Sequence, residues 1–169
     1  MEHVIYMVLN AIHNVAIVGC VAGPFYMARI VKARSRYEKR IIYDKDRLME
    51  DVITSQPQLC WMSLMALIAT GAAMPAVHFA FHGTFSETST VGYVALAVKL
   101  VCIAAMAGIL WFGTFIFNPK LKEMFALFSA ADAPDPKRET EFFALRSRRK
   151  WWCDQCWRLG VVVLLSSAV

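Results

Sequence analysis

Long stretches of this 169-residue sequence lack the charged side chains that keep a soluble protein in water. Residues 4–27 and 58–81 contain no Asp, Glu, Lys or Arg, and residues 91–117 contain only Lys99. A helix of about 20 apolar residues crosses the hydrocarbon core of a bilayer. The absence of charge therefore excludes an ordinary soluble helical domain and predicts three transmembrane helices.

A fourth apolar stretch lies at the C-terminal end and is shorter. It is free of charge only over residues 159–169, so a helix long enough to cross must begin near Trp151. Such a helix places Asp154 and Arg158 in the inner leaflet, where their i, i+4 spacing lets them pair. Trp151, Trp152 and Trp157 fit an interfacial aromatic belt. We therefore predict an all-α integral membrane protein, a single four-transmembrane-helix bundle with spans at residues 4–27, 58–81, 91–117 and 151–169.

Most of the charged residues lie in two segments, 28–57 and 120–150, in which both signs occur at helical spacing. With their flanks, these segments hold 17 of the 18 Lys and Arg residues, and the connection at 82–90 holds none. The positive-inside rule places both segments in the cytoplasm and both termini outside. The Lys and Arg residues that orient the chain in the membrane thus account for its net charge of +5. We therefore expect no nucleic-acid binding. We expect solvated helical extensions laced with ion pairs, with a turn-rich break at residues 133–136.

A cleavable signal peptide is also missing. No basic residue precedes the first apolar stretch, and no small-residue cleavage site follows a short apolar core. We expect the first helix to remain in the mature protein, most simply in a bacterial inner membrane.

Three basic side chains lie inside the predicted spans. At 1.5 Å per residue, His13 is about 13 Å and Lys99 about 10–12 Å from the outer surface. His78 is roughly 5 Å deep and shares a helix face with His82, four residues further on. A neutral His nitrogen ligates haem iron, a neutral Lys amine is a second candidate ligand, and a cationic Lys pairs with a haem propionate. This pattern predicts a cofactor site with His13 as axial ligand and Lys99 or His78 as the second.

Each of these residues also has a purely structural interpretation. Burying a lysine costs about 2.5–3.5 kcal/mol, which Lys99 avoids if it snorkels to the outer headgroups. His13 is then a buried histidine bonded to Asn10, Asn14 or a backbone carbonyl. The pair of His78 and His82 is either interfacial or a small metal site.

The five cysteines carry a weaker signal. Three of them, Cys20, Cys60 and Cys102, lie in apolar stretches and are expected to behave as small hydrophobic residues. Cys153 and Cys156 form a Cys-x-x-Cys pair, but Trp157 stands where c-type haem attachment needs a His. We expect a structural role for this pair, with redox or metal chemistry as the alternative.

Two parts of the sequence resemble a known family. Residues 11–30 read AIHNVAIVGCVAGPFYMARI and are similar to the first helix of the HemJ-type protoporphyrinogen oxidases. The step Val98-Lys99-Leu100 resembles a Val-Lys step in their third helix. The resemblance implies a four-helix membrane fold in which His13 and Lys99 are associated with haem b. CopD-like copper-resistance proteins share a related layout.

The resemblance favours a small b-type haem protein that takes part in electron transfer. It is expected to be a subunit or partner of a membrane redox complex, or to exchange electrons with quinone. The fourth helix of the family begins with an Arg-x-x-Asn-Glu-x-Pro type of motif, whereas residues 149–158 here read RKWWCDQCWR. HemJ-like protoporphyrinogen oxidation is therefore the alternative rather than the first hypothesis. A haem-free accessory subunit or a CopD-like copper transporter is the third. In each case the chain contacts the lipid bilayer and belongs to an oligomer or larger complex.

Overall fold

The computed structural model describes residues 1–37, 40–84, 89–128 and 135–167, and every regular element in them is helical. The elements are α1 (Glu2–Arg34), α2 (Tyr43–His82), α3 (Thr90–Phe112), the π-helical segment η1 (Gly113–Phe117), α4 (Asn118–Ala126) and α5 (Pro136–Ser166). The helices continue well beyond the uncharged stretches. The prediction of helical extensions in the charged segments is therefore confirmed for the described residues.

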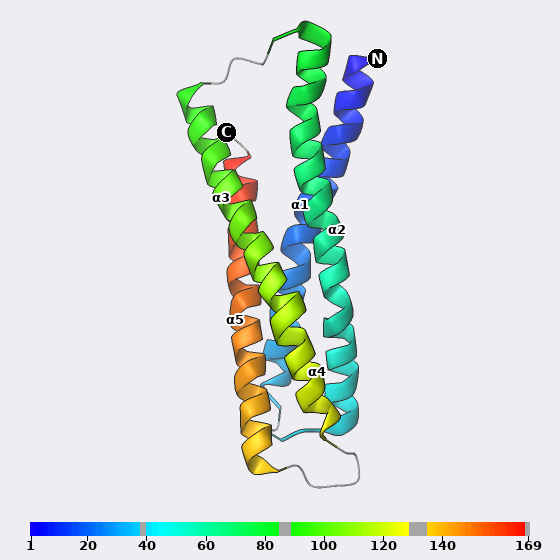
Figure 1. The fold of residues 1–169 in the computed structure, drawn as a ribbon, viewed down its shortest axis with the longest axis vertical. Helices are drawn as coiled ribbons and strands as arrows, with labels where there is room; N and C mark the ends of the chain where they lie inside the picture. The colour runs from blue at the N-terminus through cyan, green and yellow to red at the C-terminus, as the bar shows by residue number, and fades with distance from the viewer. Residues whose placement is uncertain (38–39, 85–88, 129–134, 168–169) are drawn as a thin grey trace.

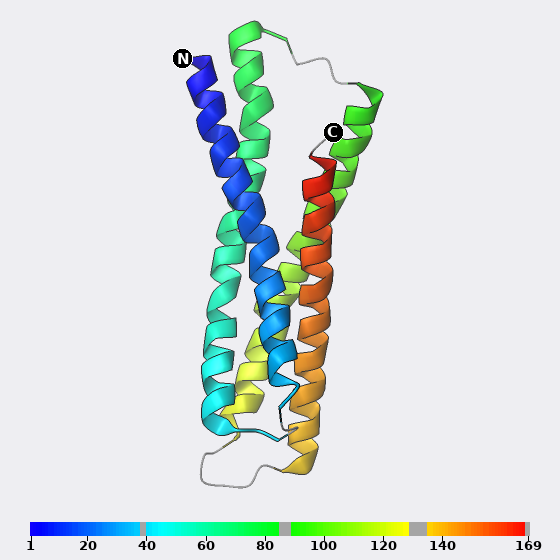
Figure 2. The same ribbon diagram turned by 180° about the vertical axis from the view of Figure 1, so that it is seen from behind.

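The long helices form an up-and-down bundle (Figures 1 and 2). Both termini lie at the same end as the α2–α3 connection, called here the outer end. The α1–α2 and α4–α5 connections lie at the opposite, inner end. Helix α1 packs against α2 and α5, and α3 packs against α5, whereas α2 and α3 contact each other only sparsely.

Three helical segments of the described chain are long and apolar enough to cross a membrane. They are α1, α2 and the continuous run of α3, η1 and α4 over Thr90–Ala126. The chain is thus an all-helical protein whose apolar helices indicate a multi-pass membrane protein. Helix α5 does not reach the same hydropathy, because its first half carries many charged residues and Asp154 and Arg158 lie within its second half.

Gly83 and Pro119 mark two points at which the helical backbone ends or changes. Gly83 caps α2 in the left-handed conformation, with φ of 69°, and its N–H donates to the Phe79 carbonyl. Glycine adopts this conformation without steric cost. The third predicted span ends at residue 117, and the chain stays helical beyond it to Ala126. Pro119 directly follows the π-helical segment η1, so its missing N–H falls where the helical hydrogen-bond register changes.

The main apolar core joins α1, α2, α3 and α5 near the middle of the bundle, around Ile17, Leu64, Leu67 and Met106. Small residues let the helices approach closely there. A Cβ atom on Gly160 of α5 would lie 2.7 Å from Cγ2 of Val21 on α1, and one on Gly19 would meet the Ser63 hydroxyl of α2. Close approach through small residues is the usual way in which membrane helices pack.

Candidate functional site

The imidazole of His13 on α1 is anchored to α2. Its Nδ1 atom lies 2.8 Å from the Thr70 hydroxyl oxygen, and that hydroxyl lies 2.7 Å from the Ala66 carbonyl. When Thr70 gives its single proton to the Ala66 carbonyl, Nδ1–H of His13 donates to Thr70. In the neutral ring, the Nε2 atom then carries a free lone pair. The structural interpretation named Asn10, Asn14 or a backbone carbonyl as the partner of His13, and the structure gives Nδ1 the Thr70 hydroxyl instead.

The surface beneath the His13 ring is flat. Gly71 follows Thr70 on α2, and a Cβ atom there would lie 3.5 Å from Cε1 of His13. A methyl group at this position would make an ordinary contact with the ring. His13 itself is half-buried, so the ring is held on one side and accessible on the other.

Lys99 of α3 lies within electrostatic range of His13. The lysine is half-buried. Among the described residues, it has neither a hydrogen bond nor a carboxylate partner. Helices α1 and α3 do not pack extensively against one another. The two predicted residues are therefore brought to a similar level, while their helices stay apart.

His78 occupies a different place from His13. It lies eight residues beyond Thr70 on α2, about 12 Å along the helix axis. Its Nδ1–H donates to the Thr84 carbonyl at 2.9 Å, and its ring lies 4.6 Å from that of His82. His82 in turn contacts Glu2 of α1 at 2.9 Å. His78 and His82 thus lie together at the outer ends of α1 and α2, at a different level from His13.

The outer half of the bundle has no packed core among the residues that the structure describes. The buried residues of α1 begin at Ala16 and those of α3 at Cys102, while those of α2 end at Thr70 and those of α5 at Val163. In this half, the α1–α2 pair diverges from the α3–α5 pair (Figures 1 and 2). His13 and Lys99 stand at the boundary between the packed and the unpacked halves.

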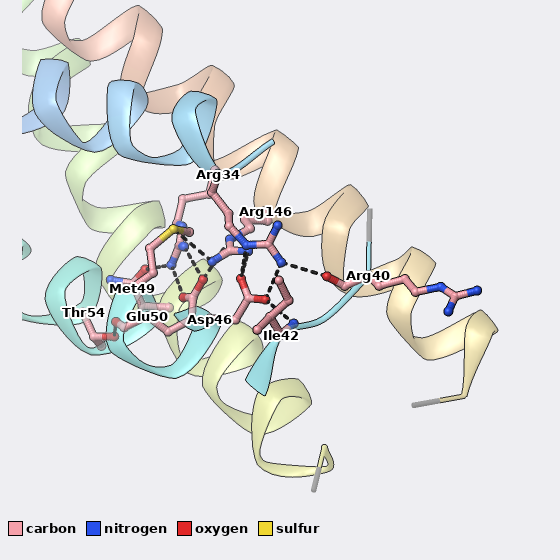
Figure 3. A network of polar contacts seen from close by, with 10 residues as sticks. Arg34, Arg40, Ile42, Asp46, Met49, Glu50, Thr54 and Arg146 are labelled. Atoms are coloured by element: carbon pink, nitrogen blue, oxygen red, sulfur yellow. Dashed lines mark hydrogen bonds and ion pairs between the residues drawn. The ribbon is translucent and has the colours of Figure 1, made fainter. Parts of the chain in front are cut away.

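The inner end is held by a buried ionic cluster, defined here as Arg34, Asp46, Glu50, Arg146 and Arg149. Figure 3 labels the first four of them. Asp46 is fully buried and accepts from Arg34 at 2.9 and 2.7 Å and from Arg146 at 2.7 Å. Glu50 accepts two bonds of 2.9 Å from Arg149. Burial lowers the pKa of Arg146, while the carboxylates of Asp46 and Glu50 act in the opposite direction. Each buried charge therefore has a partner of opposite sign, as burial in a medium of low polarity requires.

This cluster corrects the expectation that the charged segments are solvated. Its five members were expected on helix surfaces, and all of them are buried. A signal was present in the spacing, because Asp46 and Glu50 are four residues apart and Arg146 and Arg149 three apart. Each pair therefore shares one helix face. The break expected at residues 133–136 lies partly outside the described residues.

The pairing expected for Asp154 is also wrong. Its carboxylate lies 2.6 Å from the ammonium of Lys150, one turn earlier on α5. Arg158 instead places its guanidinium over the ring of Trp157, 6.0 Å from the ring centre. The aromatic face offers Arg158 a partner of its own, so the carboxylate takes the lysine.

Four cysteines from three helices gather near the middle of the bundle. Cys60 and Cys156 line two neighbouring cavities, one together with Cys20 and the other with Cys153. All five cysteines of the chain are free thiols. No group of three or more His, Cys, Asp or Glu residues with metal-binding geometry occurs in the described part of the chain. Comparison with known proteins adds no assignment, since no family model, curated protein or solved structure matches this sequence.

Proposed function

We propose that this chain is a small membrane protein that binds a b-type haem through His13 and serves electron transfer within a membrane redox complex. The haem would lie in the outer half of the bundle, between the diverging helix pairs, with Nε2 of His13 as an axial ligand. A haem held there supplies one-electron chemistry at its iron. Its electron partner is another membrane protein or a quinone.

The observation that carries this proposal is the orientation of the His13 ring. Histidines that ligate metals nearly always donate their second ring N–H to an oxygen partner, which fixes the tautomer. Thr70 is such a partner when its own proton goes to the Ala66 carbonyl. The chain would then present an oriented lone pair on Nε2 at the boundary of the unpacked region.

Lys99 gives the second argument. A lysine within the hydrocarbon faces inward and pairs with an anion or a carbonyl in most membrane proteins. No described residue supplies such a group to Lys99. A haem propionate would supply the missing negative charge, and a neutral Lys99 amine would instead be the second axial ligand. His78 lies too far along α2 to face the same iron as His13.

The test is a reduced-minus-oxidised absorption spectrum of the full chain, purified in detergent after expression with haem supplied. Wild type is expected to show a b-type α-band. His13→Ala removes the axial ligand and is expected to abolish the band. Thr70→Val removes the orienting oxygen and is expected to weaken haem affinity by about 10- to 100-fold, the usual effect of losing such a partner.

The matched control is His82→Ala, at the outer end of α2 and in contact with Glu2 rather than with His13. Its band is expected to match that of wild type. Lys99→Met distinguishes the two possible roles of the lysine. If Lys99 is an iron ligand, its loss shifts the α-band. If it pairs with a haem propionate, its loss only lowers the affinity for haem. A wild-type protein without the band, or a His13→Ala variant that keeps it, contradicts the proposal.

We further propose that α5 is a fourth span and that both termini face the outside of a bacterial inner membrane. The distribution of Lys and Arg supports this orientation. The arrangement of the bundle is consistent with it, since the two termini share one end and the charged connections the other.

Reporter fusions test this topology. Alkaline phosphatase fused after residue 169 is expected to be active, because the enzyme matures only outside the inner membrane. The same fusion after residue 126, at the end of α4, is expected to be inactive. Green fluorescent protein at the two positions should give the reverse pattern. Activity after residue 126, or its absence after residue 169, would contradict the assigned orientation.

A further inference from the structure

A recess opens between α1 and α5 at the inner end of the bundle. Its volume is about 600 Å³, within the range of about 300–1,000 Å³ that ligand sites usually have. Val31 and Phe143 form its apolar part, and Ser35 and Ser147 contribute hydroxyl groups. Helices α1 and α5 run side by side there (Figure 2).

The recess is strongly basic. Lys32, Arg34, Arg146 and Lys150 line it, and none of its lining residues in the described part of the chain is acidic. Arg34 and Arg146 also belong to the ionic cluster (Figure 3), and Lys150 is paired with Asp154. Lys32 is exposed and is the cation of this lining that faces solvent.

The depth of the recess matches the headgroup layer of a bilayer. The uncharged stretch of α1 ends at Met27, and Val31 lies four residues beyond it, about 6 Å along the helix. The polar layer on each side of a bilayer is roughly 5–8 Å thick. An apolar wall next to basic side chains at this level suits a molecule with an anionic head and an acyl chain. Basic recesses between membrane helices on the cytoplasmic side are known to bind anionic lipid headgroups.

We propose that this recess binds the phosphate-bearing headgroup of an anionic phospholipid of the inner leaflet. The phosphate would contact Lys32 beside the basic side chains that line the recess, and the glycerol and first methylenes would lie on Val31 and Phe143. The inference rests on the orientation proposed above and not on the haem. A failed haem spectrum therefore leaves it standing, and the topology fusions test its premise separately.

The test measures lipid binding to the full-length protein in a zwitterionic detergent by native mass spectrometry. Phosphatidylglycerol is expected to bind, and phosphatidylcholine with the same acyl chains is expected to bind much more weakly. Lys32→Gln is expected to weaken phosphatidylglycerol binding by about fivefold, the share of one basic residue at an anionic surface. Lys32 is exposed and forms no side-chain bond among the described residues, so this variant is expected to fold.

The matched control is Lys122→Gln, an exposed lysine on α4 that does not line the recess. It is expected to bind phosphatidylglycerol as wild type does. Equal binding of both lipids, or equal weakening by the two substitutions, overturns the proposal. Inorganic phosphate or glycerol phosphate that competes at micromolar concentration would also overturn it, because the site would then serve a soluble anion rather than a lipid.

Discussion

Asp46→Ala is expected to destabilise the protein by about 3–5 kcal/mol, the usual cost of removing one partner from a buried ion pair. Asp46 is fully buried and accepts from both Arg34 and Arg146. Its loss leaves two buried guanidinium groups without their main counter-charge, while Glu50 continues to hold Arg149. The effect is measured as the change in the free energy of unfolding in detergent.

Asp44→Ala is the matched control for this experiment. Asp44 lies two residues away on the same first turn of α2 and is exposed. Surface substitutions of this kind usually change stability by no more than about 0.5 kcal/mol. If the two alanine variants were equally stable, the ionic cluster would not hold the inner end of the bundle.

Gly160→Leu is expected to have the second largest effect, because it overfills the contact between α1 and α5. Even a Cβ atom at this position would lie 2.7 Å from Cγ2 of Val21. Valine has little freedom to move aside, since its branched side chain strongly prefers one rotamer in a helix. Overpacking of a well-packed core costs about 1–3 kcal/mol, and a leucine adds three more carbon atoms to the clash. Gly160→Ala is expected to give a smaller loss in the same direction.

The control for overpacking is Gly108→Leu on α3. A Cβ atom at Gly108 has no neighbour within 4 Å, so the larger residue meets open space. Its thermal unfolding midpoint is expected to stay at or above that of wild type, because glycine is a poor helix former. If the Gly160→Leu and Gly108→Leu variants had the same thermal unfolding midpoint, α5 would not pack on α1 as described.

The helices could be predicted from the sequence because each uncharged stretch is a local pattern. Their ends could not, since α1 and α2 continue into charged segments whose residues, such as Arg34, make contacts with distant parts of the chain. The pairing of Asp46 with Arg146 joins positions 100 residues apart. No local spacing specifies such a contact, which depends on how α2 and α5 are aligned.

The candidate site could also be predicted only in part from the sequence. The depth of His13 and Lys99 follows from counting residues along a helix, and the structure places them within electrostatic range of each other. The hydrogen bond from His13 to Thr70 could not be derived, because it depends on the register of α1 against α2 across 57 residues. Thr70 carried no distinguishing pattern of its own in the sequence.

The two ends of the bundle are held together differently. At the inner end, the ionic cluster joins α1, α2 and α5 through contacts made within the chain itself. The inner end therefore needs no ligand to stay assembled, and the protein is expected to remain folded whether or not the proposed haem is bound. Because the cluster fixes only the inner end, the separation of the helix pairs at the outer end can change without breaking it.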